Sequence, residues 1–271
     1  AISLPPTACR FSRRPEVRPN ALRSLKAAGT PILTGWLSIG ASYSAEIAAH
    51  AGYHAVTVDA QHGMMGFDVA LAMLQAISTS GAVPLVRPSA NNPAEIMRWL
   101  DAGAYGVICP MISTRGDAEA FVAACRYPPV GVRSFGPCRG LLYGGPDYFA
   151  GANEVILTLA MIETAEGLAN LEAIVATPGL DGVYVGPNDL ALALGCTPVP
   201  ESDDPVMIEA IARIQAATSA AGKLSGIFCG SGAGAARRVR EGFDLVTPGN
   251  DAMLLKAAIA QSLQAVAQAG Q

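Results

Sequence analysis

The sequence predicts a (β/α)8 TIM barrel, and three observations support this fold class. Short runs rich in Val and Ile alternate with longer stretches that have helical spacing, which is the pattern of parallel βα units. There are eight such apolar runs, the number of strands in this barrel. The runs are nearly continuous in their apolar character, so we expect strands that are buried on both faces.

The predicted strands are Pro31–Ile39, Ala55–Ala60, Val83–Pro88, Gly106–Met111, Val155–Glu163, Gly182–Pro187, Ser225–Gly230 and Leu245–Gly249. Several of the helical stretches between them open with Asp, Asn or Ser and close with Gly. They are Phe67–Thr79, Asn92–Ala102, Gly116–Arg126, Glu166–Ala176, Pro205–Ala221, Gly234–Glu241 and Asp251–Gln268. A doubly wound open sheet is the alternative, but its usual GxGxxG turn is absent after the first strand.

The chain divides into a short leader and one large domain. Residues 1–26 are rich in Pro and Arg and lack the apolar stretch of a secretory signal, so we expect a surface extension. Residues 27–271 are expected to form a single barrel domain. Two connections in it are unusually long, Tyr127–Glu154 and Asn188–Asp204, and connections of this length usually cover a site or form an interface.

Composition excludes several classes of protein. Hydrophobic residues make up 51% and charged residues 15%, which is enough for a sizeable core. The net charge of −4 and the lack of a dense basic stripe argue against nucleic-acid binding. No apolar run reaches the roughly 18 residues that cross a bilayer. The six cysteines form no CxxC pair, so we expect reduced thiols and a cytoplasmic location.

The chemistry of a TIM barrel lies at the C-terminal ends of its strands. At these positions the sequence places Asp59 and His62 after strand two, Arg87 after strand three, Glu163 after strand five and Asp189 after strand six. These residues are therefore predicted to meet at one rim.

Glu163 and Asp189 are hard oxygen donors of the kind that hold Mg²⁺ or Mn²⁺. Ion pairs with arginines are the alternative for each carboxylate. A structural zinc site is not expected, because these strand ends carry no cysteine and only one histidine.

His62 lies three residues beyond Asp59, close enough for the carboxylate to orient the imidazole for proton transfer. Arg87 follows a buried run and needs an anionic partner, either a substrate oxygen or the carboxylate of Asp59 or Glu163. His50 and His54 lie on the far side of strand two and are expected to be structural or solvated.

Two further features concern substrate and mechanism. The turn Gly186-Pro187-Asn188-Asp189 is expected to open a short helix whose free N–H groups suit a carboxylate. The three lysines, Lys26, Lys223 and Lys256, all lie away from strand C-termini, so a Schiff-base mechanism lacks its nucleophile. Metal-assisted chemistry on a carbonyl next to a carboxylate remains.

Six motifs together resemble the HpcH/HpaI family of class II 2-keto acid aldolases, over roughly residues 30–260. They are Gly35-Trp36-Leu37-Ser38, Ser42-Tyr43-Ser44-Ala45-Glu46, Asp59-Ala60-Gln61-His62, Val86-Arg87-Pro88-Ser89, Met161-Ile162-Glu163-Thr164 and Gly186-Pro187-Asn188-Asp189-Leu190. Many members have Glu where this chain has Gln61, and Gln where it has Met161, so the donor or the acceptor range is expected to differ.

The resemblance implies roles for individual residues. Glu163 and Asp189 would hold a divalent ion, Mg²⁺, Mn²⁺ or Co²⁺, Arg87 would neutralise an enolate, and His62, oriented by Asp59, would move the proton. Substrate binding would fall to Trp36, Gln61, Gly186, Pro187 and Asn188.

The resemblance also implies a homo-oligomer, a trimer of dimers. Asp101 would reach the histidine of an adjacent subunit, and the C-terminal helix from about Asp251 would be swapped between partners.

The implied reaction is the reversible cleavage of 4-hydroxy-2-keto acids into pyruvate, or hydroxypyruvate, and an aldehyde. One alternative is a lyase of the same superfamily that acts on CoA thioesters of the malyl or citramalyl type, although no basic cluster offers a grip for the CoA phosphates. The other alternative is a non-catalytic keto-acid-binding protein.

Overall fold

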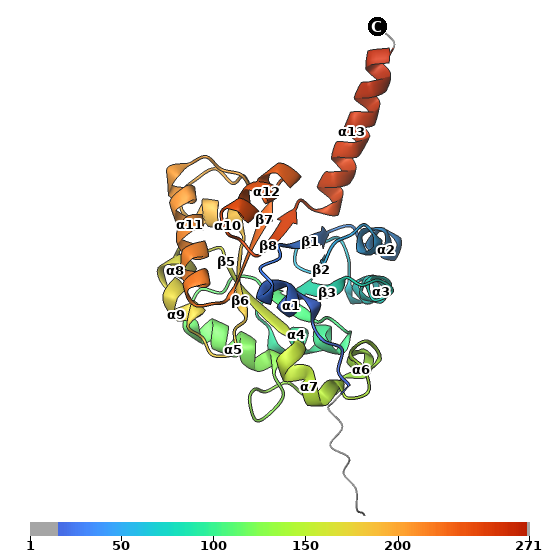
Figure 1. Cartoon of the computed structure of the whole chain (residues 1–271), viewed down its shortest axis with the longest axis vertical. Helices are drawn as coiled ribbons and strands as arrows, with labels where there is room; N and C mark the ends of the chain where they lie inside the picture. Colours follow the sequence, from blue (N-terminus) through green and yellow to red (C-terminus); the bar gives the residue numbers. More distant parts are fainter. Residues whose placement is uncertain (1–15, 270–271) are drawn as a thin grey trace, which may run out of the picture.

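The computed structural model describes residues 16–269 and confirms the predicted barrel (Figure 1). The strands pair in parallel and in chain order, and β8 pairs with β1, so the sheet is closed and the open-sheet alternative is wrong. The strands are β1 Ile32–Leu37, β2 Ala55–Asp59, β3 Val83–Arg87, β4 Gly106–Cys109, β5 Leu157–Ile162, β6 Gly182–Val185, β7 Leu224–Cys229 and β8 Leu245–Pro248.

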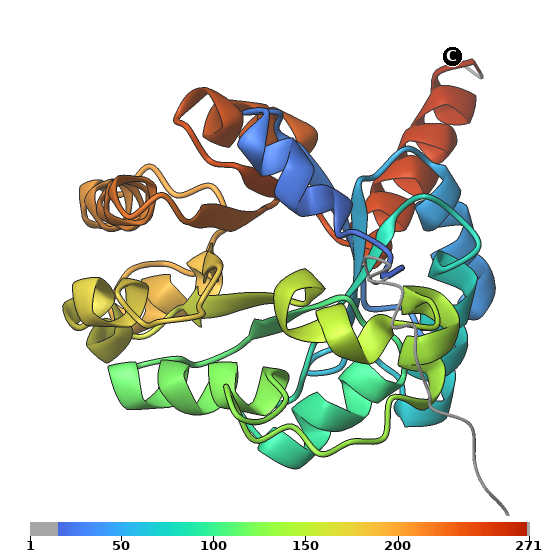
Figure 2. The same ribbon diagram turned by 60° about the horizontal axis from the view of Figure 1, so that its bottom comes forward.

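Helices surround the strands, as Figure 2 shows. Those that lead into and around the first half of the barrel are α1 Ala21–Ala27, α2 Ser42–His50, α3 Phe67–Ile77, α4 Pro93–Asp101, α5 Arg115–Cys125, α6 Cys138–Gly144 and α7 Tyr148–Val155. Those of the second half are α8 Ala165–Ala169, α9 Leu171–Val175, α10 Pro187–Ala193, α11 Pro205–Ala220, α12 Gly232–Arg240 and α13 Asp251–Ala269.

The strands are buried on both faces, as their continuous apolar sequences predict. Every residue of β2 through β6 is buried. This burial fixes the register of neighbouring strands, because a shift by one residue would turn every side chain to the opposite face. In the register observed, Asp59 at the end of β2 lies beside Arg87 at the end of β3.

The first long connection, Tyr127–Glu154, contains two helices that the sequence analysis did not predict, α6 and α7. The buried positions of α7 are Tyr148, Gly151, Ala152 and Val155, which is helical spacing. Because a glycine occupies one of these positions, the apolar pattern is weak. The predicted fifth strand therefore begins later than expected, at Leu157. The second long connection contains α10, the short helix predicted after Gly186.

The described end of the predicted extension belongs to the barrel domain, which corrects the boundary at residue 26. The side chain of Leu22 is fully buried, and the Asn20 amide donates to the carbonyls of Tyr105 and Val155. Arg23 and Lys26 form ion pairs with Asp181 and Asp244, and these two residues directly precede β6 and β8. Helix α1 therefore packs on the N-terminal end of the barrel. Residues 1–15 of the extension lie outside the described residues.

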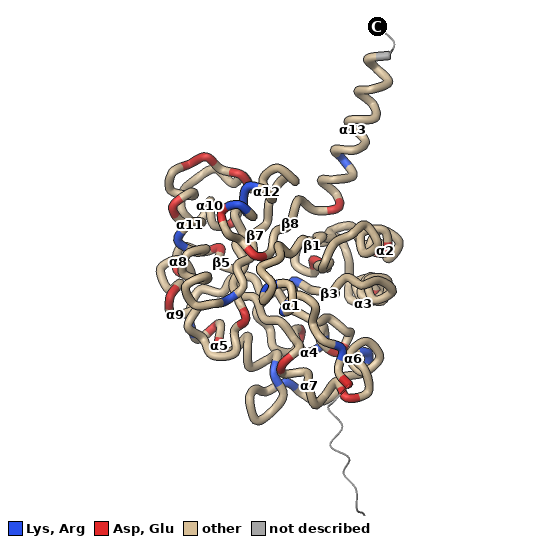
Figure 3. Tube along the Cα trace, viewed as in Figure 1, with Lys and Arg blue, Asp and Glu red and all other residues tan. Residues whose placement is uncertain are grey.

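Helix α13 projects away from its own barrel (Figure 1). It carries one acidic and one basic residue, Asp251 and Lys256 (Figure 3), and its large apolar side chains are exposed. They are Met253, Leu254, Leu255, Ile259, Leu263 and Val266. Between residues 16 and 269, no helix combines the length and the apolar character needed to cross a membrane.

If α1 is part of the domain, truncating its buried side chain should destabilise the barrel. We expect Leu22→Ala to lower the free energy of unfolding by about 2–5 kcal/mol, because the substitution leaves a cavity where a fully buried leucine packs. Urea unfolding monitored by circular dichroism measures this loss. The matched control is Leu142→Ala in α6, where the side chain is 84% exposed and the change should be small. Equal effects of the two substitutions would contradict the assignment of α1 to the core.

Candidate active site

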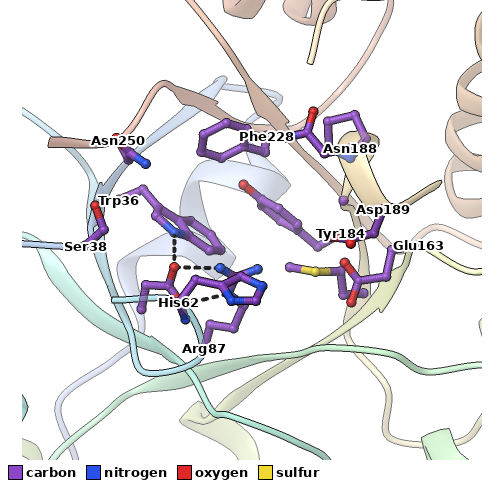
Figure 4. Close-up of a pocket in the computed structure, with 14 residues that line it drawn as sticks. Trp36, Ser38, His62, Arg87, Glu163, Tyr184, Asn188, Asp189, Phe228 and Asn250 are labelled. Carbon is purple, nitrogen blue, oxygen red and sulfur yellow. Dashed lines mark hydrogen bonds and ion pairs between the residues drawn. The ribbon is translucent and has the colours of Figure 1, made fainter. Parts of the chain in front are cut away.

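A cavity of about 290 Å³ opens at the C-terminal ends of the strands (Figure 4). Seven of the eight strands, or the turns that follow them, contribute to its walls. The lining residues are Trp36, Ser38, Asp59, His62, Arg87, Met161, Glu163, Tyr184, Gly186, Pro187, Asn188, Asp189, Phe228 and Asn250. The structure therefore brings together the five rim residues that the strand-end argument selected, and no lysine lies among the lining residues.

The carboxylate of Asp59 is the centre of a buried hydrogen-bond network. Its Oδ1 accepts from Arg87 Nε at 2.9 Å and from the amides of Gln61 and His62 at 3.1 and 3.2 Å. Its Oδ2 accepts from Arg87 Nη2 and from the indole N–H of Trp36. Burial alone would raise the pKa of Asp59, but the hydrogen bonds and charge of Arg87, with the His62 amide and the indole, outweigh it and hold the pKa below its usual value.

This network corrects one predicted role. Asp59 was expected to orient the imidazole of His62, but both of its oxygens are taken by the guanidinium, the indole and two backbone amides. A carboxylate has about four lone-pair positions, and five donors already use them. Asp59 therefore fixes the backbone turn that carries His62, and it holds Arg87. Of the anionic partners considered for Arg87, which were a substrate oxygen, Asp59 and Glu163, the structure shows Asp59.

Arg87 still faces the cavity, although two of its nitrogens bind Asp59. Within residues 16–269, the hydrogen bonds of the Arg87 side chain are made by Nε and Nη2, which leaves its third nitrogen, Nη1, without a partner, and Arg87 lines the cavity wall. The guanidinium also lies 4.9 Å from the centre of the Trp36 ring. The ion pair and the aromatic ring thus hold the guanidinium at the cavity wall, with Nη1 still able to donate a hydrogen bond.

Glu163 is a buried carboxylate, with 2% of the residue exposed. Its Oε1 accepts from the amide of Met111 at 2.8 Å, and Met111 has a φ of 58°, in the left-handed region that non-glycine residues rarely adopt. Burial raises the pKa of Glu163 to about 7, and the charge of Asp189 adds to this, whereas the Met111 amide and Arg87 act against it.

The pair Glu163 and Asp189 fits a divalent cation by the chemistry of its donors. Among the described residues, Glu163 Oε2 and the carboxylate of Asp189 have no hydrogen-bond or ion-pair partner, and both residues line the cavity. A Cβ on Gly186 would lie 2.4 Å from Glu163 Oε2, so only glycine lets this oxygen lie against the backbone. Two unpaired carboxylates at one wall, one of them buried, require a positive charge to be stable when ionised. No third His, Cys, Asp or Glu in residues 16–269 completes a larger ligand group.

Three aromatic residues, Trp36, Tyr184 and Phe228, form a further part of the cavity wall (Figure 4). Trp36 stacks on Tyr184 with ring centres 5.5 Å apart and meets Phe228 edge-on at 5.9 Å. The Tyr184 hydroxyl is 2.6 Å from the hydroxyl of Thr247. Trp36 therefore lines the cavity as predicted.

Five lining residues were not among the site residues predicted from the sequence: Ser38, Met161, Tyr184, Phe228 and Asn250. Tyr184 and Phe228 lie within apolar strands and look like core residues. Ser38 and Asn250 follow the first and last strands, so the same strand-end argument that selected the charged residues would have found them.

The structure does not bring all predicted residues to the cavity. Gln61 does not line it, because its backbone is bound to Asp59 and its side-chain Oε1 is buried away from any partner in the described chain. Asp101 also lies outside the cavity and forms an ion pair with the buried Arg133 at 2.8 Å. His50 and His54 bond to Thr79 and to the amide of Leu33, as expected for residues outside the site.

Comparison with known proteins identifies relatives of this chain. The chain is 46% identical over 242 residues to a hydroxypyruvate/pyruvate aldolase of Rhizorhabdus wittichii, an alignment that covers 89% of this chain and 96% of the relative. It is 37% identical over 239 residues to a 4-hydroxy-2-oxo-heptane-1,7-dioate aldolase of Salmonella arizonae, with 87% and 90% covered.

A crystal structure of an HpcH/HpaI aldolase/citrate lyase family protein from Burkholderia cenocepacia J2315 superposes with a TM-score of 0.85 at 36% identity. The match covers 91% of this chain and 99% of that one. The HpcH/HpaI aldolase/citrate lyase family model matches residues 34–258, which include every strand residue from Thr34 of β1 to the end of β8. The chain belongs to the HpcH/HpaI aldolase/citrate lyase family.

Proposed function

We propose that this protein is a divalent-metal-dependent aldolase that cleaves 4-hydroxy-2-keto acids, reversibly, into pyruvate or hydroxypyruvate and an aldehyde. One observation carries the proposal: a single cavity holds an unpaired carboxylate pair, Glu163 and Asp189, beside a guanidinium, Arg87, that Asp59 holds in place. The named aldolase relatives support the same reaction class.

Glu163 and Asp189 would hold the metal ion, which is Mg²⁺, Mn²⁺ or Co²⁺ in this proposal. When bound, the ion supplies positive charge to the keto and carboxylate oxygens of the substrate. The buried position of Glu163 suits this task, because its charge acts in a medium of low dielectric constant. The backbone from Gly186 to Asn188, at the start of α10, lies at the same wall and is proposed to bind the substrate carboxylate.

Arg87 and His62 are proposed to carry out the bond changes. In the cleavage direction, His62 takes the proton from the C4 hydroxyl, the C3–C4 bond breaks, and its electron pair forms the enolate of the keto acid. The aldehyde then leaves. Arg87 Nη1 stabilises the negative charge on the enolate oxygen, and His62 returns the proton to C3 to give the methyl group of pyruvate. For hydroxypyruvate, C3 carries a hydroxyl group and the proton balance is the same.

The alternatives fit the cavity less well. A CoA-thioester lyase needs cations for the CoA phosphates, and Arg87 is the one Lys or Arg among the lining residues of the described chain. A protein that only binds keto acids has no use for an imidazole beside the oriented guanidinium.

We also propose a homo-oligomer, a trimer of dimers with α13 swapped between partners. The exposed apolar side chains of α13 support it, since they need a surface to cover them. Asp101, which lies outside its own cavity, is proposed to act at the His62 of an adjacent subunit. Static light scattering that gives the mass of one chain would contradict this assembly.

The proposed reaction predicts that pyruvate enolises without an acceptor. In D₂O, the enzyme with a divalent ion should exchange the methyl protons of pyruvate faster than the free ion does, because the site stabilises the enolate. Proton NMR measures the exchange. Chelation and Glu163→Gln should suppress it, while the matched control Glu166→Gln, on the exposed first turn of α8, should retain it. Binding of pyruvate without exchange would favour the thioester lyase or the binding protein.

The proton-transfer role predicts a selective loss of rate. Removing a general base commonly costs about 10²–10⁴-fold, so His62→Ala should lose kcat by this factor while still binding metal and keto acid. His50→Ala serves as the control, because His50 bonds to Thr79 outside the cavity and should be replaceable with little effect.

The His62→Ala variant also tests the proposed action of Asp101 across a subunit interface. Inactive Asp101→Ala and His62→Ala subunits are mixed under conditions in which subunits exchange between oligomers. Part of the activity should return, because some interfaces then hold an intact Asp101 from one subunit and an intact His62 from the other. No recovery after verified exchange would mean that Asp101 does not act across an interface.

The ion pair of Asp59 and Arg87 predicts a pH dependence of stability. Because the pKa of Asp59 is lower in the folded state than in the unfolded state, its contribution is complete above the unfolded pKa, near 4, and is lost as the pH falls through the folded value. Asp59→Asn should cost about 3 kcal/mol at pH 7, since it leaves Arg87 without its charge partner.

The difference in the free energy of unfolding between wild type and Asp59→Asn should therefore narrow as the pH falls below about 4. Urea titrations at several pH values measure it. Asp68→Asn, at an exposed carboxylate in the first turn of α3, should show no such narrowing. A difference that stays constant with pH would show that the ion pair does not stabilise the fold.

A further inference from the structure

The side of the cavity opposite Glu163 and Asp189 has a distinct chemistry. Ser38, just after β1, and Asn250, just after β8, lie there together, as Figure 4 shows. Their strands are paired with each other where the barrel closes. Both residues are half-buried, and neither carries a charge.

Hydrogen bonds to neighbouring residues fix which polar atom each side chain can offer. The Ser38 hydroxyl donates to Asp251 Oδ1 at 3.0 Å, and the Ser38 amide donates to the same oxygen at 2.8 Å. With its proton committed, the hydroxyl of Ser38 offers only acceptor lone pairs. Asn250 caps α13: its Oδ1 accepts from the Met253 amide at 2.8 Å. Its side-chain NH₂ group is left as a donor.

One fixed acceptor beside one fixed donor is complementary to a hydroxyl group, which both donates and accepts. A methyl group at this place would leave both polar atoms unsatisfied. A carbonyl or an ether oxygen would satisfy only the amide of Asn250.

The charge of the cavity points the same way. Its lining holds three carboxylates, Asp59, Glu163 and Asp189, and one guanidinium, Arg87, which is bound to Asp59. Within the described chain, no uncommitted Lys or Arg lines the cavity beyond Arg87 Nη1. The metal ion and that single nitrogen serve the keto-acid half of the substrate in the proposed reaction. A second carboxylate, on the aldehyde, would find no cation of its own and would approach negative charge.

We propose that Ser38 and Asn250 recognise a hydroxyl group of the acceptor, so that the preferred acceptors are uncharged hydroxyaldehydes. Asp251 is a positioning residue, because it sets the direction of the Ser38 hydroxyl without facing the substrate. The inference rests on the proposed aldolase function, since it concerns the aldehyde of that reaction.

The test compares aldehydes of matched size with pyruvate as the common donor. Glycolaldehyde and acetaldehyde differ by one hydroxyl group, and succinic semialdehyde and butanal differ by one terminal carboxylate. The wild type should have a higher kcat/KM for glycolaldehyde than for acetaldehyde, and for butanal than for succinic semialdehyde. A higher kcat/KM for succinic semialdehyde than for butanal would overturn the proposal, because a cation would then have to reach the acceptor.

Variants separate recognition from the intrinsic reactivity of the aldehydes. Ser38→Ala removes the acceptor, and Asn250→Ser removes the amide donor but keeps a residue that caps helices well. Each should lower the ratio of kcat/KM for glycolaldehyde over acetaldehyde by about 3- to 10-fold, the value of one neutral hydrogen bond. Asn92→Ser makes the same exchange at the cap of α4, outside the cavity, and should leave the ratio unchanged.

Failure of this inference differs from failure of the proposed function. If the wild type does not exchange the methyl protons of pyruvate, the aldolase function is wrong. The other outcome is that the wild type does exchange them, but the ratio of kcat/KM for glycolaldehyde over acetaldehyde is the same in Ser38→Ala and Asn250→Ser as in the wild type. In that case only the proposed recognition of the acceptor is wrong.

Discussion

The ion pair between Asp59 and Arg87 is the interaction on which the rest of the site depends. Removing two charges from water costs several kcal/mol for each ion, and this cost is offset only when geometry and additional hydrogen bonds are good. Here β2 and β3 place the two residues side by side in register, and two guanidinium nitrogens bind the carboxylate. The same carboxylate oxygens also accept hydrogen bonds from other neighbours. The indole of Trp36 and the turn that carries His62 are held by the same two oxygens.

This arrangement also leaves the carboxylates of Glu163 and Asp189 without a basic partner in the described chain. Because Asp59 engages Arg87, the guanidinium does not form an ion pair with Glu163. Glu163 and Asp189 then lie beside each other without a basic partner in the described chain, and burial raises the pKa of Glu163 to about 7. The carboxylates of the site thus have two different tasks. Asp59 is paired and orients the Arg87 guanidinium, whereas Glu163 and Asp189 are unpaired and can bind a metal cation. Gly186 maintains this arrangement, since any side chain there would push Glu163 from its place.

The parts of the fold that follow from periodicity could be predicted, and so could the charged residues at strand ends. Eight apolar runs and the C-terminal-end rule together identify Glu163, Asp189, Arg87 and His62 without any contact being known. Partners could not be predicted, because they depend on register and rotamer. Nothing in the spacing of Asp59 and His62 reveals that both oxygens of Asp59 face a neighbouring strand and a tryptophan.

Other features were missed because their local signal is weak. The pattern of α7 contains Gly151, which packs against Val17 from the segment before α1, a contact of great sequence separation. Tyr184 is fully buried and apolar in context, so its place in the cavity wall is indistinguishable from a core position in the sequence. Leu22 lies in a basic, Pro-rich stretch whose composition predicts a surface extension, yet the side chain is buried by tertiary packing.

The two halves of the cavity are built by different parts of the barrel. β2, β3, β5 and β6 supply the charged groups proposed to act on the keto acid, whereas the closure between β1 and β8 supplies Ser38 and Asn250. The second group is bonded to the first turn of α13, through Asp251 and the cap at Met253. The direction of α13 and the polarity of the acceptor side are therefore set by the same hydrogen bonds. If Ser38 and Asn250 recognise the aldehyde as proposed, substitutions in the first turn of α13 should change the preferred aldehyde without touching the Asp59–Arg87 pair.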